Sequence, residues 1–565
     1  MPTISTEYKS YLTARFKSLE DARQDQLAWW KDAKDYLLPD HGRGLSGATS
    51  TEVNKGSTGV RDKLLDATTE HAVSVAASGM MSGMTSQARP WFKFGLRDRD
   101  MNRYLPFRVY LDAVTEIVRN AFSASNIYNG LHHNYLELLA FCGAGNLLLE
   151  DPRSLLRLDT YTAGEYYLGS DGTRVVDTFA LDIWLTVRQI VDLFGRENCS
   201  ATVGEKLDKG LTEDLVRVTY LIEPNGPAFH LPGRYPVRGV HYEYGLPEQK
   251  VLRLGGYYEF PAITPRWHVI SNSVYGTGQG RLVLPDAKML QEMQRVQLIT
   301  LKKICEPAMV ASHKQDILRT FPGGVTTPND ALSGGKDALR PLYVPDATAI
   351  RAMGEAITAT QDAIRRGYFN QLFLMLSTAN IDRMTATEVA ERHEEKLVML
   401  GPVLERMQTE LLNPLVERAY LILHRLGMLP DPPPDLQDAE LDIEYVSILA
   451  QAEKAVGVRP MEQLTAYLGN LVGAKPDALD NVDFDKVVQL YAERVGAPAE
   501  IMVMKDAVAK IRAERAKQVA MQQALAGSQQ AAQTGQMLAN SPIGKNSVLD
   551  MLLGNVSGNP TLPVR

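Results

Sequence analysis

The chain has 565 residues, of which 45% are hydrophobic and 22% are charged, and its formal net charge is −7. This is the composition of a folded globular protein, so it excludes wholesale disorder and collagen-like repeats. Sixty basic residues against 67 acidic ones give no basic excess of the kind that is typical of a general nucleic-acid binder. We therefore expect any contact with DNA to be local, weak or transient.

The cysteines and the apolar segments indicate a soluble protein of a reducing compartment. Cys142, Cys199 and Cys305 lie far apart and form no CxxC pair, so we expect neither a disulfide scaffold nor a thiolate zinc site. The first twenty residues contain no apolar region typical of a signal peptide. The most apolar stretch, 136–149, is too short to cross a bilayer of roughly 30 Å. We expect no membrane contact.

The first 150 residues predict helices. Apolar residues recur at helical spacing in three segments, 29–37, 60–81 and 106–122. Pro39 ends the first of them. An aromatic cluster around Trp91 lies between the other two.

From about residue 156 to 270 the pattern changes to that of strands. Every second residue from Val216 to Ile222 is apolar and β-branched or aromatic, which is the two-residue period of a half-buried strand. The aromatic residues at 257–260 predict another strand. One short helix is expected within this region. Thr186 and Gln189 have the spacing of a capping box at its start, and Gly195 can close its end.

Two helices then flank a turn-rich insertion. Pro285 suits the first position of a helix that runs to about Cys305, and a second helix is predicted over 347–375. The segment between them, 307–345, is rich in Pro, Gly, Asn and Asp, which are typical of turns. The two helices are therefore expected to form a hairpin that carries this insertion.

After a polar break at 377–384, the sequence predicts a long helix over 385–426. Thr385 and Glu388 form a capping box, and leucines together with Met407 follow at spacings of three and four. Pro402 and Pro414 lie within the helix, so we expect kinks. Beyond the three prolines at 432–434 the chain is predicted to be helical again, ending with a helix over 498–527 and a flexible tail.

The glycine-rich segment 275–280 has a superficial likeness to a phosphate-binding loop. Such a loop leads directly into a helix, whereas here Leu282, Val283 and Leu284 intervene before the helix predicted from Pro285. We therefore interpret the segment as a flexible joint, with Gly276, Gly278 and Gly280 as the hinge residues. A phosphate- or nucleotide-binding enzyme built on this loop is kept as an alternative.

Other chemical motifs are missing from the sequence. It contains no complete Walker A loop, no HExxH and no GxSxG. The adjacent His132 and His133 would point about 100° apart on a helix, so the pair does not predict a metal site. We expect no enzyme activity, no catalytic residues, no metal and no cofactor.

Five basic residues are candidates for contact with a polyanion. Lys302 and Lys303 lie on the first helix of the hairpin, Arg365 and Arg366 lie on the second, and Arg383 lies in the break that follows. Solvent-exposed helix faces are the ordinary explanation for the two pairs.

Several segments, taken together and in this order, carry a resemblance to a known family. They are Pro90-Trp91-Phe92, the glycine segment with 284–290, RMTATEVAER at 383–392, Glu395-Lys396, 399–402, ELLNPL at 410–415, and 445–452. The chain resembles the head-to-tail connector (portal) proteins of short-tailed (podovirus, T7-like) bacteriophages. The matching segments spread from about residue 20 to 500.

The resemblance implies a mixed α+β fold, mainly α, in a ring of twelve subunits. The regions that it implies are a wing (1–284), a first stem helix (285–306), a clip (307–346), a second stem helix (347–376), a tunnel loop (377–384), a long wing helix (385–428), a crown (435–527) and the tail (528–565). It also implies a conduit for packaging and ejection of double-stranded DNA at one capsid vertex of the virion. The implied partners are a terminase packaging motor, a tail adaptor or other tail proteins, and capsid and scaffolding proteins.

Another ring-forming virion protein, such as a tail adaptor, is a second alternative. Adaptors are usually much shorter than this chain and lack its succession of two helices, an insertion and a long helix. The portal interpretation is therefore preferred.

Overall fold

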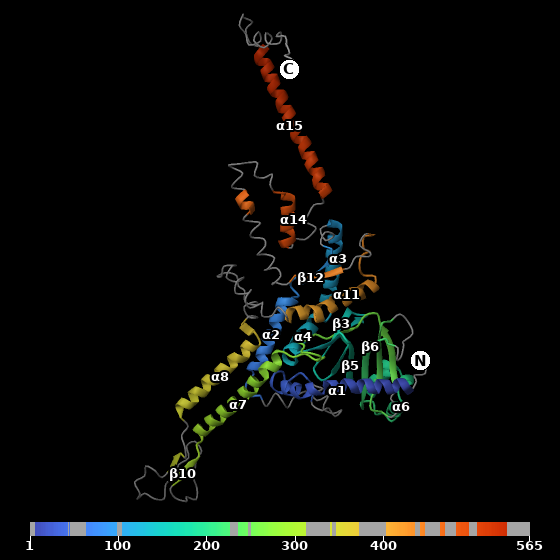
Figure 1. Ribbon diagram of the computed structural model, residues 1–565, viewed down its shortest axis with the longest axis vertical. Helices are drawn as coiled ribbons and strands as arrows, with labels where there is room; N and C mark the ends of the chain where they lie inside the picture. Colours follow the sequence, from blue (N-terminus) through green and yellow to red (C-terminus); the bar gives the residue numbers. More distant parts are fainter. Residues whose placement is uncertain are drawn as a thin grey trace, which may run out of the picture.

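The computed structural model describes residues 6–42, 45, 64–98, 104–226, 235–246, 250–311, 339–341, 346–371, 403–434, 441–446, 464–468, 482–495 and 505–539. It has a body of mixed helices and strands from which two helical parts project (Figure 1). The hairpin of α7 (Gln279–Cys305) and α8 (Ala347–Gly367) extends from one end of the body. The long helix α15 (Lys505–Ala539) lies toward the opposite end. A mixed, mainly helical fold is confirmed.

The remaining helices and the strands form the body and its connections. The helices are α1 (Thr6–Tyr36), α2 (Thr68–Met84), α3 (Leu105–Ala124), α4 (Ile127–Phe141), α5 (Val187–Phe194), α6 (Ala201–Asp208), α11 (Asn413–Arg425) and α14 (Phe484–Val495). The strands are β1 (Phe92–Leu96), β2 (Gly145–Asp151), β3 (Leu155–Tyr161), β4 (Tyr166–Ser170), β5 (Val176–Thr186), β6 (Leu215–Pro224), β7 (Val237–Glu243), β8 (Val251–Tyr257), β9 (Ala262–Ile263), β10 (Met309–Ala311), β11 (Leu339–Pro341) and β12 (Leu441–Tyr445). Among the described helices, none combines the length and apolar character needed to cross a membrane.

A five-stranded antiparallel sheet forms one half of the described body, in the order β4-β5-β6-β7-β8. The long helix α1 packs on this sheet because Tyr8, Leu12, Phe16 and Leu19 form one apolar stripe at spacings of three and four. The stripe shares one buried cluster with residues of all five strands, including Leu221 of β6. The helix ends at Tyr36, in agreement with the stop predicted at Pro39.

The strand predicted at 216–222 is present as β6, but the prediction that it is half-buried is wrong. Every residue from Val218 to Glu223 is buried. Leu221 packs with α1, whereas Val218 belongs to a cluster with α5 and α6, and Ile222 to a third cluster. A central strand covered on both faces shows no clean inside–outside pattern.

A buried ion pair joins β6 and β7 beneath α1. The guanidinium of Arg238 donates to Glu223 Oε1 from Nη2 at 2.6 Å and from Nε at 3.0 Å. Both side chains are under 5% exposed, and Tyr11 of α1 donates to the other oxygen of Glu223 at 2.9 Å. The pair therefore links the first helix to the centre of the sheet.

Removing one partner of this pair is expected to destabilise the fold strongly. Arg238→Ala removes the closer of two guanidinium groups beside the buried Glu223 carboxylate and leaves only that of Arg15, with Nε at 3.6 Å. Removing one partner of a buried pair typically costs about 3–5 kcal/mol. Denaturant titration of the free energy of unfolding measures this. As a control, Arg157→Ala removes a half-exposed pair with Asp159 and is expected to cost less than about 1 kcal/mol. Equal losses in the two variants would contradict the role given to burial.

A second core joins the helices to distant parts of the chain. Residues of α2, α3, α4, α8 and α11 form one buried cluster with β1. Strand β1 pairs with β12, so that Phe92 lies opposite Tyr445. The aromatic cluster around Trp91 is thus the site where the N-terminal part of the chain meets a segment after the three prolines. The expectations of helix throughout the first 150 residues and after the prolines are wrong at β1, β2 and β12.

The short helix predicted inside the β region is confirmed as α5. Thr186 Oγ1 accepts from the amide of Gln189, the Gln189 side chain accepts from the amide of Thr186, and Gly195 follows with φ of 83°. The prediction of a single helix is wrong, because α6 follows after a 3-10 turn. Ser200 caps α6 by accepting from the amide of Val203, a signal that the sequence also contains.

Several predicted helix boundaries also differ from those observed. Helix α2 begins at Thr68 rather than at 60, and α7 begins six residues before Pro285, which therefore lies inside the helix. Helix α8 ends at Gly367, and Phe369 just after it has a left-handed φ of 55°, so the helix predicted over 347–375 is interrupted. Residues 370–371 are helical again, and 372–375 lie outside the described residues. Helix α15 begins at Lys505 rather than 498 and continues through Ala539, into the segment expected to be a flexible tail. The strand expected at 257–260 ends at Tyr257.

The pH dependence of stability is expected to include a contribution from His241 of β7. Its ring stacks on Tyr220 with centroids 3.7 Å apart, and burial lowers the pKa of His241 to about 3, with the charge of Arg253 adding to the effect. The unfolded chain, with a histidine pKa near 6.5, therefore binds more protons, and stability falls as the pH decreases from about 6.5 toward 3. The loss is at most about 1.4 kcal/mol per pH unit. His241→Asn is expected to flatten this slope in denaturant titrations. An unchanged slope would exclude His241 as the source.

Candidate functional site

The described hairpin of α7 and α8 is held to the body at one end only. Near its start, α7 buries Val283, Ala287 and Leu290. An added Cβ on Gly367, at the end of α8, would lie 2.5 Å from Val283, so the two helices meet closely where they leave the body. The far ends are joined by the antiparallel pair β10–β11.

Asp66, in the segment before α2, is hydrogen-bonded to both helices of the hairpin. Its carboxylate accepts from Gln294 Nε2 of α7 at 3.0 Å and from Gln361 Nε2 of α8 at 2.8 Å. Gln291 adds a bond to the carbonyl of Asp66. Burial by itself raises the pKa of Asp66, but the hydrogen bonds from Thr68 and the two glutamines outweigh it and hold the pKa below its usual value. The carboxylate therefore stays charged and bonded to both helices.

The glycine-rich segment before α7 is packed tightly against the end of α4. A Cβ on Gly276 would lie 2.1 Å from the carbonyl oxygen of Cys142, and one on Gly280 would lie 2.0 Å from that of Ala140. A Cβ on Gly278 would lie 2.5 Å from the ring of Trp267. Close approach is thus a sufficient reason for glycine at all three positions, and the hinge role stays a prediction.

The amides that a phosphate at this loop would need already have another acceptor. Helix α7 follows the loop directly, so the reason first given against a nucleotide site, three intervening residues, is wrong. The amides of Gly280 and Arg281, which would face a phosphate, instead hydrogen-bond the thiol of Cys142. Burial raises the pKa of Cys142 to about 12, so this acceptor is the neutral thiol.

The half of α7 beyond Gln291 has no fully buried side chain among its described residues. Leu282, Met289 and Val296 follow one another at intervals of seven, so they lie along one line, on the side nearly opposite to the buried residues. Their exposed fractions are 67%, 45% and 39%. We name these three residues the α7 stripe. Further apolar residues toward the end of α7 are also exposed: Leu298, Ile299, Leu301 and Ile304.

The two basic pairs predicted as polyanion contacts lie at opposite ends of the hairpin. Lys302 and Lys303 are exposed in the last turn of α7, at its far end. Arg365 and Arg366 are exposed in the last turn of α8, beside Val283, which is about 28 Å from Lys302 along α7. Arg365 also pairs with Asp362 at 2.9 Å. Arg383 lies outside the described residues.

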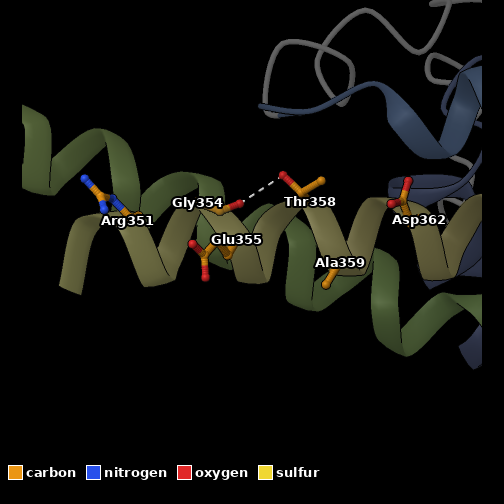
Figure 2. A pocket seen from close by; sticks show the side chains of 6 residues that line it. All are labelled: Arg351, Gly354, Glu355, Thr358, Ala359 and Asp362. Carbon is orange, nitrogen blue, oxygen red and sulfur yellow. Dashed lines mark hydrogen bonds between the residues drawn. The ribbon is translucent and has the colours of Figure 1, made fainter. Parts of the chain in front are cut away.

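A shallow hollow of about 700 Å³ follows the outer face of α8. Six residues line it, all from this one helix (Figure 2): Arg351, Gly354, Glu355, Thr358, Ala359 and Asp362. Thr358 Oγ1 donates to the carbonyl of Gly354 at 3.0 Å, within the helix itself. One basic and two acidic side chains on an exposed helix face do not form a chemically defined site.

The described part of the predicted long helix is irregular where Pro414 suggested a kink. Residues Gln408–Leu412 are π-helical and lead directly into α11. Within this segment, Glu410 accepts from the backbone amide, Nε and Nη2 of Arg266, the last at 2.7 Å. Arg266 lies beside Gly276, so this ion pair links the long helix to the loop that leads into α7. The start of the long helix and Pro402 lie outside the described residues, as do the polar break and most of the insertion.

Sequence reasoning missed the contacts that form between distant segments. Asp66 and the Glu410–Arg266 pair carry no local motif. The same is true of a group formed by His41, His133 and Glu137, whose side chains lie together. Only the spacing of four between His133 and Glu137 was visible in the sequence; His132, the adjacent histidine, is not part of the group.

Comparison with known proteins identifies the family. The family described as bacteriophage head to tail connecting protein matches residues 9–503. The chain is 35% identical to the portal protein of Salmonella phage epsilon15, over 98% of this chain and 99% of that protein. It is 34% identical to the probable portal protein of Bordetella phage BPP-1, over 97% and 99% of the two chains.

A solved structure of the virion of a native gene transfer agent particle also matches, with 12% identity and a TM-score of 0.29 over 70% of this chain and 89% of that one. A TM-score this low supports no conclusion about the fold. The family match and the two full-length relatives favour neither a tail adaptor nor a nucleotide-binding enzyme. The chain belongs to the family of bacteriophage head to tail connecting proteins, and its role is that of a phage portal at the head–tail junction of the virion.

Proposed function

We propose that the chain forms a closed ring of twelve subunits through which double-stranded DNA passes during packaging and ejection. The observation that carries this proposal is the α7 stripe on a hairpin that projects from the body. Apolar side chains along one face of a projecting helix are stabilised when another surface covers them. In a closed ring, the hairpin of each neighbouring subunit supplies that surface, so every copy of the stripe is covered.

The proposed regions are those given by the resemblance. Helices α7 and α8 form the stem, the insertion with β10 and β11 forms the clip, and the body up to residue 284 forms the wing. The clip contacts the packaging motor and later the tail adaptor. The crown corresponds to 435–527, although β12 at its start pairs with β1 of the wing. No step in this function requires the chain to be an enzyme, because the motor is a separate protein.

The charge of the chain suits a conduit rather than a clamp. Twelve copies at −7 give a formal charge of 12 × −7 = −84. Each phosphate that a protein neutralises adds affinity and salt dependence, so a bore rich in cations would hold DNA in place. Lys302, Lys303, Arg365, Arg366 and Arg383 are proposed as the few transient contacts. Charge reversal at these positions that left DNA packaging and retention unchanged would remove them from the channel.

The mass and symmetry of the purified protein test the ring. Light scattering is expected to give 12 × 62.5 = 750 kDa, and top views in the electron microscope are expected to show twelvefold rings with a central hole. A stable monomer or dimer at high concentration would contradict the conduit.

A further inference from the structure

A fully buried carboxylate in α4 lies beside two imidazoles. His41 Nδ1 is 2.6 Å from Glu137 Oε1, and His133 Nε2 is 3.8 Å from the same oxygen. One ligand atom from each of the three residues lies within 4.8 Å of the other two. The Glu137 side chain is 0% exposed, whereas those of His41 and His133 are 15% and 33% exposed. The group is therefore buried at its base and open to solvent at its rim.

Two elements bring these residues together. His133 and Glu137 are four residues apart on α4, so their side chains lie on the same helix face. His41 follows the end of α1 and is directed to α4 by a tight turn, in which Gly42 has φ of 68°. The three side chains therefore converge from two segments that are distant in sequence.

The carboxylate is fixed by hydrogen bonds from a third segment, the turn between β3 and β4. Thr162 Oγ1 donates to Glu137 Oε1 at 2.7 Å, and the amide of Ala163 donates to Oε2 at 3.0 Å. The amide of Gly42 in turn donates to Thr162 Oγ1 at 2.6 Å. Partners that orient a carboxylate ligand in this manner are typical of protein metal sites.

We propose that His41, His133 and Glu137 bind one Zn²⁺ ion, with water as the fourth ligand. Two imidazoles and a carboxylate are a ligand set that Zn²⁺ prefers, and four-coordinate sites with three protein ligands keep one position for water. The ion places positive charge beside the buried carboxylate of Glu137 and replaces the hydrogen bond between His41 and Glu137. It ties the end of α1, helix α4 and the β3–β4 turn to one another.

Binding requires one ring to turn and His41 Nδ1 to move apart from Glu137 Oε1. Two ligand atoms about 2 Å from one tetrahedral ion lie about 3.3 Å apart, whereas these two lie 2.6 Å apart. The two imidazoles are stacked, with centroids 4.7 Å apart and 22° between their planes, and nearly parallel rings cannot both direct a nitrogen at one ion. A third of the His133 side chain is exposed, so this ring has room to rotate about its Cβ–Cγ bond. We therefore expect the stack to open when the metal binds.

Cobalt and zinc binding by the full-length, chelator-treated protein tests the site. Co²⁺ is expected to give the visible absorption of a four-coordinate N/O site at one ion per chain, and Zn²⁺ is expected to displace it. His133→Ala is expected to weaken binding at least tenfold, whereas His132→Ala, a change of the same kind at the adjacent position, leaves it unchanged.

A second variant, Glu137→Gln, keeps the size of the buried side chain and is expected to abolish the cobalt spectrum. Circular dichroism of each variant verifies that the helices are intact. The proposal is overturned if the treated wild-type protein binds neither ion, or if His133→Ala binds both as tightly as His132→Ala does.

Discussion

Placing two negative charges on the α7 stripe is expected to leave subunits that fold but do not assemble. Met289 and Val296 are 45% and 39% exposed in the single chain, so Met289→Glu with Val296→Glu changes little within the subunit. In the proposed ring the same positions are covered by a neighbour. Burying a fully exposed side chain of this kind is worth about 1.5–3 kcal/mol, and covering the 39–45% that is exposed here is worth less than half of that. Burying an unpaired carboxylate there is unfavourable. Because every interface of the ring carries the same two substitutions, the loss of association free energy is repeated at each interface.

Light scattering measures the outcome as a shift in mass from the ring toward 62.5 kDa. The matched control is Leu193→Glu with Leu211→Glu, which makes the same chemical change at two exposed leucines, one on α5 and one after α6. This control is expected to form rings as the unmodified protein does. Rings of unchanged mass and stability from the α7 double variant would show that the stripe is not an interface between subunits.

The features that the sequence predicted well depend on neighbours along the chain. The capping box of α5 consists of two side chains and two amides within four residues, so its spacing is sufficient to predict it. The end of α11 at Arg425, before Gly427 with φ of 66°, and the end of α1 before Pro39 are of the same kind. Each of these stops follows from the backbone preference of one residue.

The features that it did not predict depend on distant contacts. Strand β1 is a strand because β12 pairs with it, and no local pattern marks five residues whose partner is hundreds of positions away. The alternation in β6 suggested one solvent-exposed face, but α1 and a second cluster cover both. The start of α7 was placed at Pro285 because proline favours a first position, whereas contacts with α4 begin the helix at Gln279.

The candidate site shows the same division. The hairpin and its insertion were visible as two helical patterns around a turn-rich segment. The hydrogen bonds of Asp66 with α7 and α8 and the Glu410–Arg266 ion pair were not visible in the sequence, because each joins single residues from separate segments. The basic pairs were found by composition alone, and composition does not reveal that they lie at opposite ends of the hairpin.

Gly280→Ala is expected to be severely destabilising, because the space that a Cβ needs is occupied by backbone. The added carbon would lie 2.0 Å from the carbonyl oxygen and 2.7 Å from the carbonyl carbon of Ala140 in α4. Neither atom can move without moving the helix, so the cost is expected at or above the upper end of the usual 1–3 kcal/mol for overpacking. The matched control is Gly354→Ala in α8, where nothing lies within 4 Å of the added Cβ. In that exposed helix the change is expected to stabilise by up to about 1 kcal/mol.

The free energy of unfolding of these two variants separates packing from flexibility at the loop before α7. If Gly280 is needed for close approach, Gly280→Ala unfolds at lower denaturant concentration and Gly354→Ala at higher concentration. If Gly280 is instead a hinge, Gly280→Ala would fold with nearly normal stability and form rings. It would then lose DNA packaging or ejection, because the stem could not move against the body. Since the Cβ would clash with the backbone carbonyl groups of both Ala140 and Leu139, we expect the loss of stability.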